Sequence, residues 1–495
     1  MKSLLIRADA SREIGTGHVM RCLAMAQAWK DRGGFAHFAC AELPDTLRRR
    51  LAEESFTVHS LTTQCGTTAD AEVTSRLARE VGAEWIVVDG YCFNRAFQSV
   101  LHASGRKVLV LDDNGETGPW GCDAILNQNT HASTIDYGDR LDGCTLLRGS
   151  RYALLRREFQ PALRDHFPAR DQADGLRLLI LMGGSDAENI TCQLLSILKK
   201  LQSGIHSARV ICGGANSHLA ELETSASALG FPCEVICNVS DMTPHFRWAN
   251  AALTAAGSTC WELCAFRVPF LPFAIVPNQN AIARSFGGIP WESETAAAAV
   301  TDWIKKMKSS MFEISIPDVD AKGADRVCSF LQSVASFSDV DGNRYDLRLA
   351  DEQDAELLFE WANDPTVRKQ SFQTESITWQ THCTWMASGD PGRTIYICER
   401  ESEPVGSVRF ESVSGNEALA NIQMGADWRG KRLAAPLISA ASQMYSSQHA
   451  NCTIVAKIKP DNSASSRAFE KAGYTISKTT SDPLNLTYIY TDAIV

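Results

Sequence analysis

A turn of small residues precedes a histidine near the start of the chain. Residues 15–18 read Gly-Thr-Gly-His, between the strand-like run SLLIRA and an apolar helical run. Gly15, Thr16 and Gly17 let the backbone approach a ligand closely, and the free N–H groups of a helix start suit a phosphate. His18 is on the first helical turn, whose positive end disfavours imidazolium, so we expect a neutral ring able to act as a general base. The alternative is that His18 only caps or packs this helix.

A second turn of this kind occurs in residues 255–262, AAGSTCWE. Ser258 is placed to cap the helix, while the N–H groups from Gly257 to Thr259 face an anion. Glu262 follows one turn later, where we expect it to accept hydrogen bonds from a ribose diol. The alternative is a surface glutamate that stabilises the helix start.

A third turn joins a strand to a helix near the C-terminus, and it is basic. Residues 429–434 read RGKRLA, between the alternating run NIQMG and the helical run over 436–444. Helix-start N–H groups and three cations predict a second diphosphate site. About thirty residues later the chain reads NSASSRAFEKAGY over 462–474. Either segment alone would be a weak signal, because basic turns are usually only solvated.

Alternating strands and helices must position these turns. Residues 1–160 alternate strand-like and helix-like segments, and the pattern restarts at residue 176. Strands separated by helices imply parallel sheets with crossover helices, and ligands bind at the carboxyl ends of such strands. We therefore predict two Rossmann-like halves, 1–160 and 161–334, facing each other across a cleft. The polar segment 335–343 is expected to be a linker, and 344–495 a third domain.

Length and composition indicate the class of protein. A chain of 495 residues predicts roughly two to four domains. Its net charge of −10 argues against a general nucleic-acid surface, and its apolar runs are too short to cross a membrane. The sixteen cysteines include no CxxC pair, so we expect reduced, mostly buried thiols in a cytoplasmic enzyme. No motif predicts a required metal.

The first two-thirds of the chain resembles a known family. RADASREIGTGHVMRCLAMA, VVDGY, CDAILNQN, RYALLRREF, MGGSDAENIT and ANAALTAAGSTCWELCAFRVPFL together resemble the UDP-sugar hydrolases of pseudaminic acid biosynthesis. The resemblance covers roughly residues 1–325 and implies a GT-B fold, a pair of Rossmann-like domains. It implies that His18 is the catalytic histidine, that Glu262 binds the ribose and that Gly257-Ser258-Thr259 bind the diphosphate. It also implies that Tyr91 and Asn189 lie in the substrate cleft.

The last third resembles the GNAT acetyltransferases, an α+β family, through the basic turn, the 462–474 segment and the run LFEWANDPTV. Two departures from the family pattern concern the site. Arg432 occupies the position of the middle glycine, and Phe469 that of the tyrosine that often protonates the leaving thiolate. The acid is therefore open between Tyr474, Ser465 and water. The residues that this resemblance implies for acetyl-CoA binding are Met424, Arg429, Gly430, Lys431, Leu433, Ala434, Asn462, Ser465 and Phe469.

These expectations combine into a bifunctional enzyme. The C-terminal domain would acetylate the C4 amine of a UDP-4-amino-4,6-dideoxy-N-acetyl-β-L-altrosamine with acetyl-CoA. The N-terminal halves would then hydrolyse the UDP-diacetamido sugar to free sugar and UDP. The alternatives are a GT-B glycosyltransferase that moves the sugar to an acceptor, or a hydrolase whose terminal domain only binds acetyl-CoA.

Overall fold

A computed structural model describes most of the chain. The residues outside the description are 1, 12, 116–117, 119, 139–143, 161–174, 185, 202–203, 214–215, 308–316, 318, 389, 391, 415, 450–451, 478–484 and 491–495. The chain divides into two compact units, Met1–Val327 and Cys328–Val495. Unit 1 contains two sheets and unit 2 contains one.

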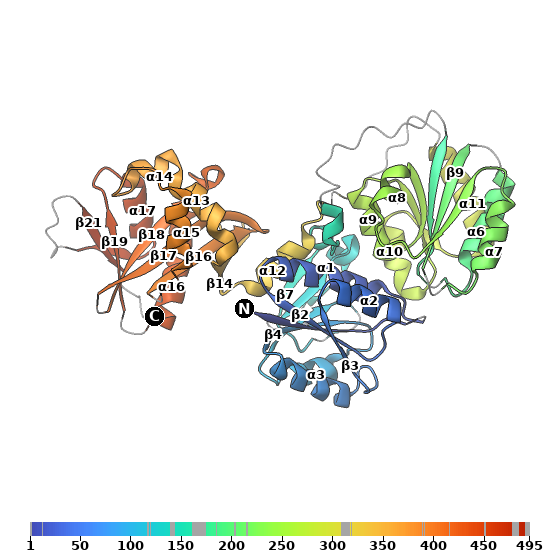
Figure 1. The fold of residues 1–495 in the computed structure, drawn as a ribbon, viewed down its shortest axis with the longest axis horizontal. Helices are drawn as coiled ribbons and strands as arrows, with labels where there is room; N and C mark the ends of the chain where they lie inside the picture. Colours follow the sequence, from blue (N-terminus) through green and yellow to red (C-terminus); the bar gives the residue numbers. More distant parts are fainter. Residues whose placement is uncertain are drawn as a thin grey trace. The chain divides into compact units, whose positions relative to one another are not determined.

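The first sheet has seven parallel strands in the order β3-β2-β1-β4-β5-β6-β7, a Rossmann-type order that reverses between β1 and β4. Its central strands are buried on both faces, as their continuous apolar sequences predict. Helices α1 and α2 lie on one side of this sheet and α3 on the other (Figure 1). The elements are β1 (Ser3–Ala8), α1 (Gly17–Asp31), β2 (Phe35–Cys40), α2 (Asp45–Glu53), β3 (Thr57–Ser60), α3 (Thr68–Glu80), β4 (Ala83–Asp89), α4 (Arg95–His102), β5 (Lys107–Leu111), β6 (Ala124–Asn127) and β7 (Thr145–Arg148).

The second sheet repeats this topology with six parallel strands in the order β10-β9-β8-β11-β12-β13. Its order reverses between β8 and β11, and helices cover both of its faces (Figure 1). The predicted class, two parallel α/β halves, is confirmed. The boundary expected between the halves at residue 160 adjoins residues 161–174, which lie outside the described residues. The elements are β8 (Leu176–Leu181), α6 (Ile190–Leu201), β9 (Ile205–Cys212), α7 (Leu219–Ser227), β10 (Cys233–Cys237), α8 (Thr243–Trp248), β11 (Ala251–Ala255), α9 (Thr259–Ala265), β12 (Phe270–Ala274), α10 (Asn280–Ser285), β13 (Ile289–Pro290) and α11 (Ser293–Met307).

Unit 2 is built on a mixed sheet of eight strands, ordered β14-β15-β16-β17-β18-β19-β21-β20. Alternate residues of β16 separate its two faces: Tyr396 packs into the main core with α16, while Ile395 and Ile397 pack on Leu358 of α13. The elements are β14 (Ala335–Ser338), β15 (Arg344–Leu349), α13 (Ala355–Asn363), α14 (Pro365–Gln370), α15 (Trp379–Ala387), β16 (Arg393–Arg400), β17 (Glu403–Ser414), β18 (Glu417–Met424), α16 (Ala434–Gln448), β19 (Thr453–Ile458), α17 (Ser463–Lys471), β20 (Tyr474–Ile476) and β21 (Leu486–Tyr490).

The segment 335–343 is not the linker that its polar composition predicts. Ala335–Ser338 form β14, which pairs antiparallel with β15. The Phe337 ring stacks on the Tyr345 ring, with the two ring centroids 5.0 Å apart. The division between the units falls earlier, within α12 (Gly323–Gln332). Short polar residues suited a turn, but their alternation also provides an edge strand with one packed face.

The prediction that all cysteines are reduced is wrong for two pairs. Cys65 is bonded to Cys92, and Cys212 to Cys237. Cys212 and Cys237 are register partners at the ends of β9 and β10, with Cα atoms 4.8 Å apart. Strand register brings such pairs together, and the spacing of cysteines along the sequence does not reveal it.

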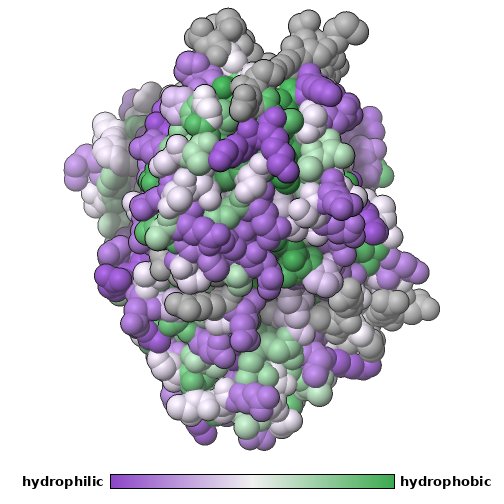
Figure 2. Space-filling view, turned by 90° about the vertical axis from the view of Figure 1, so that its right-hand side faces the viewer, coloured by the Kyte–Doolittle hydropathy of each residue, from purple (hydrophilic) through white to green (hydrophobic). Residues whose placement is uncertain are grey.

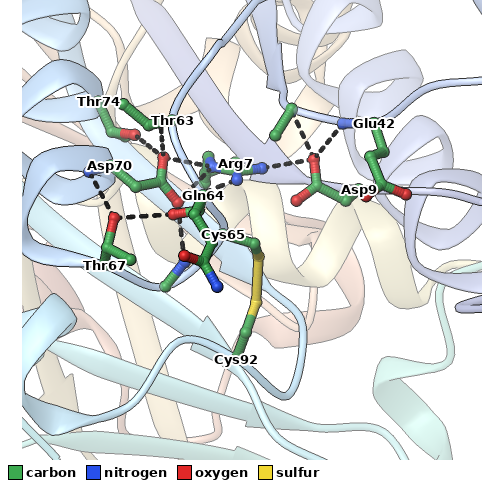
Figure 3. Close-up of a disulfide and its surroundings, with 12 residues drawn as sticks. Arg7, Asp9, Glu42, Thr63, Gln64, Cys65, Thr67, Asp70, Thr74 and Cys92 are labelled. Carbon is green, nitrogen blue, oxygen red and sulfur yellow. Dashed lines mark hydrogen bonds and ion pairs between the residues drawn. A yellow bond between two sulfur atoms is a disulfide. The ribbon is translucent and has the colours of Figure 1, made fainter.

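The Cys65–Cys92 bond joins the loop before α3 to the loop after β4 (Figure 3). Beside it the Arg7 guanidinium is buried between two carboxylates, with Nη1 2.7 Å from Asp9 and Nη2 3.0 Å from Asp70. The loop that bears Cys92 is thus fixed on the first sheet, and it begins at the cleft residue Tyr91 described below.

The face of the molecule shown in Figure 2 is covered by interspersed hydrophilic and hydrophobic residues. Within the ranges that the structure describes, no helix has the length and apolar character needed to span a membrane.

Candidate active sites

A cleft of about 310 Å³ in unit 1 is lined by the turns that follow the central strands of both parallel sheets. These are the turns after β1 and β4 in the first half and after β8 and β11 in the second, at the two points where strand order reverses. The turns approach each other closely: a Cβ on Gly184 would lie 3.5 Å from Thr16 Oγ1, and one on Gly17 would lie 4.0 Å from Ser258 Oγ. Of the residues predicted for this site, those lining the cleft are Gly15, Thr16, Gly17, His18, Tyr91, Gly257, Ser258 and Thr259.

His18 has a buried carboxylate as its partner. Its Nδ1 lies 2.7 Å from Asp89 Oδ1, at the end of β4, and Asp89 is fully buried. A carboxylate on Nδ1 fixes the ring and selects the tautomer that keeps the lone pair on Nε2. Among the described residues, Nε2 has no hydrogen-bond partner, so it is free to take a proton from a bound water.

Arg21 connects this pair to a second carboxylate. Its Nε and Nη2 lie 2.7 and 2.6 Å from Asp89, and its Nη1 lies 2.8 Å from Asp113. Burial by itself would raise the pKa of Asp89, but the charges of Arg21 and His18 hold that pKa well below its usual range. Burial would likewise raise the pKa of Asp113. The charge of Arg21 outweighs burial, so the pKa of Asp113 is lowered. Two carboxylates and one guanidinium leave a net negative charge behind His18.

Tyr91 lies against both parts of this cluster. Its hydroxyl donates to Asp113 at 3.0 Å, and its ring lies edge-on to His18 with centroids 5.1 Å apart. Burial, with the charge of Asp113, raises the pKa of Tyr91, so its hydroxyl stays protonated at neutral pH. Tyr91 therefore forms one wall of the cleft beside the candidate base.

The second turn presents backbone rather than side-chain groups. Ser258 precedes α9 as expected, but its hydroxyl makes no capping hydrogen bond. Glu262 does not line the cleft; its Oε1 is 3.2 Å from Arg156 Nη2. Burial raises the pKa of Glu262, although the charge of Arg156 and its hydrogen bond act to lower that pKa. A ligand that uses Glu262 must therefore share it with Arg156 or displace it.

Asn189 is next to the cleft rather than in it. Its neighbours Glu188 and Ile190 line the cleft, whereas Asn189 itself does not. Its backbone is left-handed, with φ +51°, and its Nδ2 donates to Glu221 at 2.8 Å. Its Oδ1 is buried without a hydrogen-bond partner among the described residues. The amide oxygen thus retains an unused acceptor close to the cleft.

The basic turn of unit 2 follows β18, as predicted. Strands β18 and β19 pair in parallel only over Glu417–Leu419, and β19 then pairs with β21. Helix α16 begins directly after the turn, at Ala434, with Leu433 as its N-cap residue. Arg429 Nε donates to Met424 O at 3.1 Å, and its Nη2 is 3.0 Å from Asp364. Gly430 and Lys431 belong to this turn, and the Lys431 ammonium lies 4.6 Å from the Trp428 ring centroid.

The residue in the glycine position keeps a glycine-like backbone. Arg432 has φ +62°, in the left-handed region, and its side chain is exposed. Its guanidinium is therefore not buried in the turn. In the second segment, Asn462 caps α17 by accepting a hydrogen bond from Ser465 N at 3.1 Å.

Phe469 is a core residue. It is 3% exposed and lies edge-on to Tyr474 with centroids 4.9 Å apart. Tyr474 is also buried, and its hydroxyl is 2.7 Å from Ser442 Oγ. Of the candidate acids left open by the sequence, Ser465 remains partly exposed, so Tyr474 is the weaker candidate.

Sequence reasoning missed Asp89, Arg21, Asp113 and Asn129, whose Nδ2 donates to Asp113 at 2.9 Å. Three of them stand within or directly after strands of the predicted parallel sheet. Polar residues at consecutive strand ends share one sheet edge, and this signal could have identified them. Arg21 lies one turn after His18 on the same helix.

Comparison with known proteins finds relatives of both units. An acetyltransferase (GNAT) domain family matches residues 344–475. Residues 344–475 form a GNAT domain. The UDP-2,4-diacetamido-2,4,6-trideoxy-beta-L-altropyranose hydrolase of Campylobacter jejuni is 26% identical over 282 residues, covering 57% of this chain and 94% of its own. A spore coat polysaccharide biosynthesis protein of Bacillus subtilis, SpsG, is 22% identical and covers 66% of this chain and 97% of its own.

An uncharacterized protein of Methanocaldococcus jannaschii is 20% identical over 96% of this chain and 97% of its own. The similarity of that archaeal protein therefore extends along both units. Together the comparisons support an enzyme that combines a hydrolase-related GT-B-like unit with a GNAT acetyltransferase domain.

Proposed function

We propose that this chain carries out two consecutive reactions on one nucleotide sugar. Unit 2 transfers acetyl from acetyl-CoA to the C4 amine of UDP-4-amino-4,6-dideoxy-N-acetyl-β-L-altrosamine. Unit 1 then hydrolyses the resulting UDP-diacetamido sugar to free sugar and UDP. The similarity to the Campylobacter jejuni hydrolase supports the second reaction, and the GNAT domain supports the first.

The hydrolysis rests on one observation above all: His18 lines the cleft between the two phosphate-type turns, with Nδ1 on buried Asp89. Nε2 accepts a proton from water as the water oxygen attacks the anomeric carbon. The bond from that carbon to the diphosphate oxygen breaks, and UDP leaves. Helix-start and turn N–H groups near Gly17 and Gly257 are placed to stabilise the charge on UDP.

The acetyl transfer uses the turn between β18 and α16 as its cofactor site. We expect the CoA diphosphate to accept hydrogen bonds from the N–H groups after Arg429, with Arg429 and Lys431 supplying positive charge. The amine nitrogen of the sugar attacks the thioester carbonyl, the carbon–sulfur bond breaks and the CoA thiolate takes a proton. Acetyl-CoA is the co-substrate in this proposal, and neither reaction is assigned a metal.

Incubation with the UDP-diacetamido sugar in water, without any acceptor, tests the hydrolysis. The proposal expects UDP and free sugar in equal amounts. A glycosyltransferase would leave the sugar largely uncleaved until an acceptor is added. Release of CoA thiol in the presence of the 4-amino UDP-sugar tests the transferase, because a unit that only binds acetyl-CoA would release none.

A further inference from the structure

Three arginine side chains lie close together in unit 2, away from the turn assigned to acetyl-CoA. The guanidinium carbons of Arg393 and Arg409 lie 4.0 and 5.3 Å from the ring centroid of Trp385. Arg409 is the register partner of Ile395, so it projects from the sheet face that α13 and α15 cover. Arg368, on α14, is near enough to act electrostatically on Arg409.

The positive charge of this cluster is not balanced by the described residues around it. Burial lowers the pKa of Arg409, and the charges of Arg393 and Arg368 lower it further. The carboxylate of Glu411, whose Oε1 is 3.4 Å from Arg409 Nε, acts in the opposite direction. Burial also lowers the pKa of Arg368. One carboxylate therefore faces three guanidinium groups. Like charges brought together at a partly buried site are unfavourable unless an anion joins them.

Unused hydrogen-bond donors accompany the charge. Nε of Arg368 and Nδ2 of Asn421 are buried and have no hydrogen-bond partner within the described part of the chain. Asn421 is the register partner of Arg409 on β18, so both side chains point to the same face. Helix α14 also carries one unused acceptor, Gln370 Oε1, at its last residue. Buried donors without partners are rare in folded proteins, and here donors predominate, which suits a ligand rich in anionic oxygens.

The remaining contacts of the cluster hold the guanidinium groups in place. Arg368 Nη1 donates to the carbonyl oxygens of Gln373 and Glu375 at 3.2 and 3.3 Å. Arg393 Nη2 donates to Trp385 O at 2.7 Å. These neutral partners orient the arginines without cancelling their charge, so the site is already formed before a ligand arrives.

The position of the cluster along β18 indicates which anion it receives. Met424 ends β18 at the start of the acetyl-CoA turn, and Asn421 lies three residues before it. Three residues of a strand correspond to a distance of roughly 10 Å. We propose that Arg368, Arg409 and Asn421 bind the diphosphate of the nucleotide-linked aminosugar that accepts the acetyl group. One sugar ring and its linkage span such a separation, so the diphosphate would hold the C4 amine near the end of β18, beside the proposed cofactor site. The inference rests on the proposed acetyl transfer and assigns its acceptor site.

The test measures steady-state acetyl transfer by the full-length protein. Two acceptors are compared: the UDP-linked 4-amino sugar and the same 4-amino sugar without UDP. Wild type should strongly prefer the UDP-linked acceptor. Arg409→Gln should raise the KM for the UDP-linked acceptor at least about tenfold and leave the KM for acetyl-CoA within about twofold. Lys457→Gln removes an exposed cation from the same domain and is the matched control, expected to change neither.

Two further measurements keep the test decisive if Arg409→Gln does not fold. Arg368→Gln should give the same acceptor-specific rise, and UDP should inhibit wild-type transfer competitively against the aminosugar. An unchanged acceptor KM in folded variants overturns the inference, as does equal use of both acceptors by wild type. A rise confined to the KM for acetyl-CoA would assign the cluster to the phosphates of CoA and would also overturn it. If wild type transfers acetyl to neither acceptor, the proposed acetyl transfer itself fails, and this inference fails with it.

Discussion

Replacing Asp89 by Asn removes the charge that holds His18 and should slow hydrolysis severely. In the wild type one Asp89 oxygen is 2.7 Å from His18 Nδ1, and Arg21 binds both oxygens at 2.6 and 2.7 Å. An amide side chain can offer His18 its N–H₂ group, which would favour the tautomer with the proton on Nε2. A general base contributes ~10²–10⁴ in rate. We therefore expect UDP release to fall by at least about a hundredfold.

The same substitution should also destabilise unit 1. Asp89 is fully buried and shares Arg21 with Asp113, so its loss leaves that guanidinium with one carboxylate. Disrupting a buried pair costs about 3–5 kcal/mol. The pH dependence follows from the lowered pKa of Asp89: its contribution is present at neutral pH and is lost as the pH falls toward the folded-state pKa. The wild type should therefore lose stability in acid more steeply than Asp89→Asn.

The assay measures UDP release and acetyl transfer on the same preparation, with thermal unfolding followed from pH 7 downward. Acetyl transfer is an internal control, because it belongs to unit 2. Asp302→Asn, at an exposed pair with Lys306, is the matched control and should change neither activity. Hydrolysis within a few-fold of wild type in a folded Asp89→Asn variant would refute the role given to this carboxylate.

Four further predictions follow from the two sites. His18→Asn should abolish UDP release while acetyl transfer persists; hydrolysis within a few-fold of wild type would make His18 structural. Glu262→Ala should weaken UDP binding at least about tenfold by calorimetry, since a charged hydrogen bond contributes about 1.5–3 kcal/mol, and an unchanged affinity would remove Glu262 from the nucleotide site. Arg429→Ala should raise the KM for acetyl-CoA and leave hydrolysis unchanged; the reverse pattern would contradict the cofactor assignment. A fragment 328–495 should melt cooperatively and acetylate the UDP-aminosugar, whereas 344–495 should melt at a lower temperature because it lacks β14; equal melting would show that β14 adds nothing.

Local sequence patterns predicted the elements that position the cleft. The Gly-Thr-Gly-His turn and the Gly-Ser-Thr turn each follow a short apolar run and precede a helical one, and both lie where strand order reverses. These signals are local because a turn, a cap and a short buried strand depend on residues that are close in sequence. The second half showed the same strand–turn–helix order, so its topology followed as well.

Contacts between distant segments could not be predicted in the same way. Asp89 reaches His18 across 71 positions, and Arg21 reaches Asp113 across 92. Such pairs depend on the register and order of parallel strands, which composition does not encode. The Cys212–Cys237 pair, which joins partners on the parallel strands β9 and β10, was missed for the same reason.

Phe469 is a signature residue whose side chain the structure buries. Its place in the signature predicts a contact with the cofactor, and the residue packs in the core beside Tyr474. A phenylalanine lacks the hydroxyl that would keep one end of the side chain at a polar site, so burial is its favourable state. The proton for the thiolate must therefore come from another group or from water.

Mass spectrometry of the products formed from the 4-amino UDP-sugar, with and without acetyl-CoA, tests the two-step account most directly. With acetyl-CoA, we predict free diacetamido sugar, UDP and CoA, with the acetylated UDP-sugar as a transient species. Without acetyl-CoA, the 4-amino UDP-sugar should remain intact. Release of UDP from the unacetylated sugar, or accumulation of acetylated UDP-sugar that is never cleaved, would contradict the account.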